Sequence, residues 1–105
     1  MADKTGQMLS LCFAPYNVII RFMDVIVEFN QAAFRHNISK EDILHALETK
    51  VYDVSIGELP EKCVVIGFDR AGNPLELLYN PVDDNSIYIF HAMKLRNSTI
   101  EMLRS

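Results

Sequence analysis

Four short apolar runs in the second half of the chain most constrain its fold. They cover residues 51–56, 62–69, 75–80 and 86–92, and most are rich in β-branched or aromatic side chains. The turn-forming sequences AGNP and NPVDDN separate the last three runs. Consecutive strands joined by tight turns pair antiparallel, so this half of the chain predicts a β-meander.

The remaining predicted elements are a further strand and two helices. Residues 24–29 (DVIVEF) have the apolar, β-branched composition of a strand. Ser39 and Asp42 form a capping-box pattern at a helix over residues 40–48, and Ser98 begins a second such pattern before a short terminal helix. Strands and helices do not alternate as in a parallel doubly wound fold. We therefore expect an α+β fold, with a small antiparallel sheet of four to five strands packed with two or three helices.

Length and composition favour one domain behind an N-terminal extension. Half of the 105 residues are hydrophobic, which is enough for one core. Residues 1–22 look unlike the strand pattern that follows, so we place the extension there and the domain at residues 23–105. The apolar second half of the extension can cover a sheet edge or pair with a second copy of the chain, which would allow a homodimer.

Charge and composition restrict the partners and the compartment. Ten basic and fourteen acidic residues give a net charge of −4, which repels polyanions, so RNA binding would need a local basic patch. Cys12 and Cys63 make no disulfide framework, and neither a membrane span nor a signal peptide is recognisable. We therefore expect a cytoplasmic protein without a membrane partner.

The sequence gives no support for a cofactor or a metal. It has no P-loop, dinucleotide fingerprint, HExxH or paired CxxC motif. His36, His45 and His91 lie in different predicted elements, without the spacing of metal ligands. We therefore expect neither a cofactor nor a metal site.

The candidate chemical groups are cations and imidazoles near the ends of predicted elements. They are Arg35 and His36 before the first helix, Arg70 in the central hairpin turn, and His91, Lys94 and Arg96 at the end of the last strand. His91 has the strand parity of Ile87 and Ile89, which predicts a residue held by the core face with its ring reaching the margin of the sheet. Such a histidine can be catalytic, can bind phosphate or can be a structural residue at the margin of the core, and the pattern leaves these roles open.

Three segments resemble the BrnT-type and related small toxins of the RelE/ParE superfamily, which belong to bacterial toxin–antitoxin systems. FRHNISKEDILHALE is similar to the family segment with a histidine ahead of a helix, VVIGFDRAGNPLELLY to its hairpin, and IYIFHAMKLRNSTIEML to its closing strand and corner. Asn37 stands where the family usually has Gly, and Asn also adopts left-handed backbone angles. The resemblance covers about residues 27–103.

The resemblance implies a type II toxin that acts as a metal-independent endoribonuclease and is inhibited by a cognate antitoxin. Attack of the RNA 2′-hydroxyl on the adjacent phosphate needs a base, an acid and cations. By the resemblance, His91 is the acid or base, and Arg70, Lys94 and Arg96 bind the phosphate. Arg35 and His36 are then the next candidates for contact with RNA. Two alternatives stay open: a non-catalytic relative that binds protein, and an enzyme acting on a small molecule.

Overall fold

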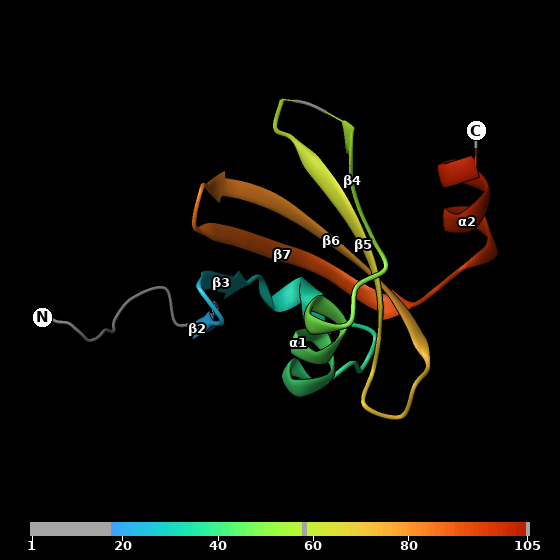
Figure 1. Ribbon diagram of the computed structural model, residues 1–105, viewed down its shortest axis with the longest axis horizontal. Helices are drawn as coiled ribbons and strands as arrows, with labels where there is room; N and C mark the ends of the chain where they lie inside the picture. The colour runs from blue at the N-terminus through green and yellow to red at the C-terminus, as the bar shows by residue number, and fades with distance from the viewer. Residues whose placement is uncertain (1–17, 58, 105) are drawn as a thin grey trace, which may run out of the picture.

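The computed structural model describes residues 18–57 and 59–104 (Figure 1). These residues form one six-stranded sheet, two α-helices and one 3-10 helix. In chain order the elements are β2 (Val18–Phe22), β3 (Val25–Phe29), η1 (Gln31–Phe34), α1 (Lys40–Glu48), β4 (Tyr52–Gly57), β5 (Lys62–Phe68), β6 (Pro74–Asp83), β7 (Ser86–Lys94) and α2 (Asn97–Arg104). The α+β class expected from the sequence is confirmed.

The six strands have the order β2-β3-β7-β6-β5-β4. The meander from β4 to β7 is antiparallel, as predicted. β3 pairs with β7 in parallel, with Val27 opposite Ile87, because the last strand of the meander returns to lie beside β3. The expectation of a purely antiparallel sheet of four to five strands was therefore wrong in the strand number and in this one pairing.

The edge strand β2 is built from the end of the predicted N-terminal extension. It pairs antiparallel with β3, with Phe22 opposite Val25, so Met23 and Asp24 form the turn between the two strands. Ile20 and Phe22 pack against the buried core. Residues 18–22 thus belong to the sheet, and the rest of the predicted extension, residues 1–17, lies outside the described residues.

α1 packs tightly on one face of the sheet (Figure 1). Ser39 caps its N-terminus by accepting a hydrogen bond from the Asp42 amide at 3.1 Å. Ile43 and Ala46 are fully buried in the core between the helix and the sheet. The backbones come closest at Gly67 of β5, where a Cβ atom would lie 1.9 Å from the Ala46 carbonyl oxygen. Only glycine fits at this position.

α2 is attached to the sheet more loosely than α1. Figure 1 shows this helix standing to one side of the strands, and its buried residue is Thr99. Met102 of α2 and the apolar side chains Ile56, Val64 and Leu78 of the sheet line a cavity of about 260 Å³. Polar contacts rather than close apolar packing therefore connect this helix to the sheet.

Candidate functional site

A buried glutamate, Glu76, is the centre of the candidate site. Its neighbours in β6, Leu75 and Leu77, belong to the core on the α1 face, so the Glu76 side chain points to the opposite face. This side chain is only 2% exposed. A carboxylate in such a place needs hydrogen bonds and opposite charge to compensate for its lost hydration.

Three residues surround the Glu76 carboxylate. Arg96 donates to it from Nη2 at 2.6 Å, from Nε at 3.1 Å and from its backbone amide at 3.1 Å. The Thr99 hydroxyl donates to Oε1, and Nε2 of His91 lies 2.9 Å from Oε2. Burial opposes ionisation of Glu76, but the hydrogen bonds outweigh it and lower its pKa to about 2. We call Glu76, His91, Arg96 and Thr99 the Glu76 cluster.

A β-bulge turns His91 toward Glu76. The strands β6 and β7 pair Tyr79 with Ile89 but Leu78 with His91, so Phe90 is an extra residue in β7. Ala92 then takes the place in the core that simple alternation would give to His91. The predicted assignment of His91 to the core face was therefore wrong, because the alternation of side chains does not hold across a bulge.

His36 reaches His91 from the loop between η1 and α1. β3 ends opposite Ile89, so η1 rather than a strand lies beside the next part of β7. The two imidazole rings meet edge to face, with centroids 5.6 Å apart and planes at 69°. His36 and Arg35 are exposed, whereas the His91 side chain is only 18% exposed. The structure therefore pairs a solvent-open imidazole with a largely buried one.

Arg70 and Lys94 are not part of the Glu76 cluster. Nε and the backbone amide of Arg70 donate to Oδ1 of Asp42 in α1, at 2.8 and 3.0 Å, and these bonds lower the pKa of Asp42. Lys94 is paired with Leu75 and has the parity of Ala92, which places it toward the α1 face. The predicted composite of His91, Arg70, Lys94 and Arg96 is thus reduced to His91 and Arg96, with His36 beside His91.

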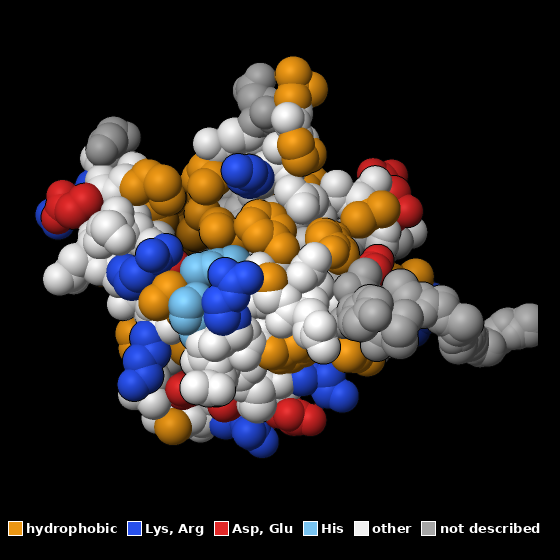
Figure 2. All heavy atoms as spheres, turned by 180° about the vertical axis from the view of Figure 1, so that it is seen from behind, with side chains coloured by type: hydrophobic (Ala, Val, Ile, Leu, Met, Phe, Trp, Pro, Cys, Tyr) orange, Lys and Arg blue, Asp and Glu red, His pale blue; other side chains and the backbone are white. Residues whose placement is uncertain are grey.

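Two arginines lie near the paired imidazoles, because Arg35 precedes His36 in the chain and Arg96 binds the same Glu76 carboxylate as His91. Figure 2 shows histidine side chains between Lys and Arg side chains, next to an apolar area of the same face. Arg35 forms no ion pair with any residue that the structure describes, so its charge is available to an anion. With Nε2 of His91 on the carboxylate, Nδ1 has no hydrogen-bond partner among the described side chains. The site thus offers imidazoles for proton transfer and cations for a phosphate.

Glu76 and Thr99 were missed by sequence reasoning. Glu76 is the acid in the run PLELLY, where it alternates with leucines of the core. An acid inside a strand that is buried on both faces signals a buried partner. That signal, read together with the nearby His91 and Arg96, could have identified the cluster.

The described residues contain neither a recognisable metal site nor a helix that could span a membrane. Within residues 18–57 and 59–104, no group of three or more His, Cys, Asp or Glu side chains is arranged to hold a metal ion. In the same part of the chain, no helix is both long and apolar enough to cross a membrane. No protein-family model, curated protein or solved structure matches the chain.

Proposed function

We propose that this chain is a metal-independent endoribonuclease and the toxin of a type II toxin–antitoxin system. The observation that best supports this proposal is the position of His91, whose Nε2 lies 2.9 Å from the buried Glu76 carboxylate and whose ring lies against His36. Cleavage of RNA by its own 2′-hydroxyl needs a base and an acid close together. Two neighbouring imidazoles can provide both.

In the proposed reaction His91 is the base. When Nε2–H donates to Glu76, Nδ1 carries the lone pair that takes the proton of the 2′-hydroxyl. The Glu76 carboxylate fixes this tautomer and stabilises the imidazolium that forms. The 2′-oxygen attacks the phosphorus, and a 2′,3′-cyclic phosphate forms as the bond to the 5′-oxygen breaks.

His36 and two arginines supply the remaining groups. His36 is exposed, and in its protonated form it donates a proton to the departing 5′-oxygen. Arg35 lies next to it in the chain, and Arg96 is 49% exposed although it also binds Glu76. These guanidinium groups stabilise negative charge on the phosphate as it develops. They also supply the local positive charge that a chain of net charge −4 needs for RNA binding.

The toxin assignment rests on the resemblance of residues 27–103 to BrnT-type and other RelE/ParE proteins. The structure has the general α+β class that the resemblance implied, with a six-stranded mixed sheet that is larger than expected. The proposal includes an RNA substrate, a cognate antitoxin and action in the cytoplasm.

A non-catalytic role in binding another protein is the second candidate. β4 is an edge strand, and its residues Tyr52 and Ile56 are each 38% exposed. An edge with exposed apolar side chains suits pairing with a strand of a partner. In this case the Glu76 cluster would serve only to hold α2.

RNA cleavage by the purified chain tests the ribonuclease proposal, on free RNA with EDTA present and, in a separate assay with magnesium, on mRNA of translating ribosomes. We expect products with 2′,3′-cyclic phosphate ends from at least one of these substrates. The exposed His36 should tolerate substitution, and His36→Gln should lower the rate by about a hundredfold or more.

His45→Gln is the matched control for this assay. His45 lies in α1, on the opposite face of the sheet from the Glu76 carboxylate, and its Nδ1 contacts the Phe68 carbonyl oxygen at 2.7 Å. Its replacement should therefore leave the cleavage rate nearly unchanged. A folded wild-type chain that cleaves neither substrate would contradict the proposal and favour the binding role.

A further inference from the structure

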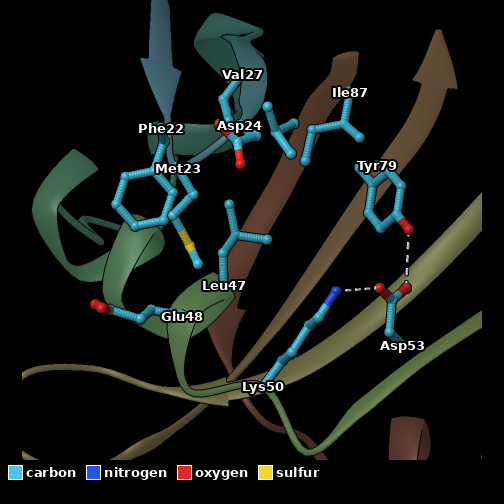
Figure 3. A pocket seen from close by; sticks show the side chains of 11 residues that line it. Phe22, Met23, Asp24, Val27, Leu47, Glu48, Lys50, Asp53, Tyr79 and Ile87 are labelled. Atoms are coloured by element: carbon cyan, nitrogen blue, oxygen red, sulfur yellow. Dashed lines mark hydrogen bonds and ion pairs between the residues drawn. The ribbon is translucent and has the colours of Figure 1, made fainter. Parts of the chain in front are cut away.

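We propose that a second cavity, on the α1 face, binds a small organic cation with an apolar body. The cavity has a volume of about 560 Å³ and lies between the β2–β3 turn, the end of α1 and the strands β6 and β7 (Figure 3). Cavities of this size accommodate a ligand of one or two rings. The sheet separates this cavity from the Glu76 cluster, so the inference does not depend on the ribonuclease proposal.

The apolar body of the ligand would rest on aliphatic side chains. Leu47 and Ile87 line the cavity and are only partly buried, so they offer it apolar surface. The fully buried Val27 lies beneath them in the core and supports this surface. The Phe22 ring and Met23 form a wall at the hairpin turn. Covering this surface with a flat ring would remove apolar area from water, which favours binding.

The charges around the cavity favour a cation. Three carboxylates line it, those of Asp24, Glu48 and Asp53, against one ammonium group, that of Lys50. Lys50 Nζ is bound to Oδ2 of Asp53 at 2.6 Å. Asp24 and Glu48 form no ion pair with any described residue. The lining is thus negative after its one ion pair is counted, which attracts an ammonium group and repels a carboxylate.

Asp24 is the group that would bind the ammonium. In Figure 3 its carboxylate lies among the apolar side chains of the cavity, whereas the Glu48 side chain extends away from them. Asp24 follows Met23, which has a φ of 58°, an uncommon angle for a large side chain. This turn presents Met23 and Asp24 side by side at the mouth of the cavity.

The opposite wall of the cavity is polar, but its hydrogen-bonding groups already have partners. The Tyr79 hydroxyl donates to Oδ1 of Asp53 at 2.8 Å, and Lys50 occupies the other oxygen. Burial and the bond to Asp53 raise the pKa of Tyr79, so its hydroxyl keeps its proton as a donor. This wall therefore shapes the cavity and does not compete with Asp24 for the ligand.

Calorimetric titration of the full chain with three indole compounds tests the inference. Tryptamine carries an ammonium group, indole is neutral and indole-3-propionate carries a carboxylate. We expect saturable binding of tryptamine, about tenfold weaker binding of indole and still weaker binding of indole-3-propionate. No saturable binding of tryptamine, or equal binding of the cation and the anion, would overturn the inference.

Matched variants locate the binding. Asp24 is exposed, so Asp24→Asn should weaken tryptamine by about threefold without changing indole, whereas Asp84→Asn, in the exposed turn after β6, should change neither. NMR contacts between the indole ring and the methyl groups of Leu47 and Ile87 should appear in the unmodified chain. Equal effects of the two Asp→Asn changes, or ring contacts elsewhere on the chain, would overturn the inference.

Discussion

The two helices are attached to the two faces of the sheet by opposite physical means. α1 packs its buried Ile43 and Ala46 into the apolar core and touches β5 through the backbone at Gly67. α2 is connected through Arg96 and Thr99 to the carboxylate of Glu76. Dispersion and hydrophobic burial fix the first helix, whereas hydrogen bonds to one buried charge fix the second.

The difference shows where reactive groups can lie in a small domain. On the α1 face the ion pair between Arg70 and Asp42 is exposed, with Arg70 61% exposed, so water screens it and it contributes little. On the other face the Glu76 carboxylate is shielded from water and orients His91. A histidine whose ring is fixed by a buried carboxylate is better placed for proton transfer than any group of the exposed pair.

The largest expected effect is on the α1 face. Gly67→Ala would place a Cβ atom 1.9 Å from the Ala46 carbonyl oxygen, so α1 or β5 has to move. We expect a loss of at least about 4 kcal/mol of stability, measured by urea unfolding. Gly57→Ala is the control, because a Cβ atom there has nothing within 4 Å. Equal stability of the two variants would show that the α1 contact is not close.

Glu76→Gln should have the next largest effect. The amide removes the negative charge that Arg96 and His91 face. Its NH₂ group is a donor and can point at the N–H donors of these two residues, with which it forms no hydrogen bond. We expect a loss of about 3 kcal/mol and a melting temperature lower by more than about 10 °C. Faster amide hydrogen exchange in α2 than in α1 of this variant would show that the loss of stability is centred on α2. The exposed Glu41→Gln in α1 is the control, and an equal effect of both would contradict the role of burial.

The stability that Glu76 provides should depend on pH. Its pKa falls from the ordinary 4.5 to about 2 on folding, so the contribution is fully present above pH 4.5 and is lost as pH falls toward 2. The full amount is about 3 kcal/mol. Urea unfolding of the wild type near neutral pH and at a pH of about 3 should show much of this loss. Glu76→Gln should show a clearly shallower dependence, and parallel curves would contradict the prediction.

The smallest expected effects are the changes in melting temperature caused by replacing Arg96 and Arg70, and these two changes should differ. Arg96→Gln removes two side-chain hydrogen bonds from a buried carboxylate, so we expect a clear fall in melting temperature. Arg70→Gln removes one from the exposed Asp42, and the melting temperature should change by less than about 2 °C. High salt should weaken only the Arg70 contribution. A larger fall for Arg70→Gln than for Arg96→Gln would reverse the comparison.

Local patterns in the sequence predicted most helices and strands, but they did not predict which distant strands pair with one another. The capping pattern at Ser39 gave the helix at residues 40–48, which is α1 as observed. β6 continues through Pro81 to Asp83, three residues past its predicted end at residue 80, because Pro81 still pairs with Ile87 despite its turn propensity. The parallel pairing of β3 with β7 joins segments about sixty residues apart, and no local pattern encodes it.

The candidate site was predictable only in part, for the same reason. His91, Arg96 and His36 stood out as cations and imidazoles at element ends, but a bulge at Phe90 set the direction of the His91 ring. Arg70 was placed in the site by the family resemblance and by its charge, but its side chain is bonded to Asp42, which lies in another element. Side-chain partners across a sheet depend on register and bulges, which the composition of a strand does not reveal.

The rate of RNA cleavage by His91→Gln tests the central claim most directly. Gln keeps a donor for Glu76 but cannot act as a base, so the variant should fold, with a melting temperature close to that of the wild type. We predict a loss of about a hundredfold or more in single-turnover cleavage, and nearly wild-type cleavage by His45→Gln. Undiminished cleavage by a folded His91→Gln protein would contradict the claim that the imidazole held by Glu76 performs the chemistry.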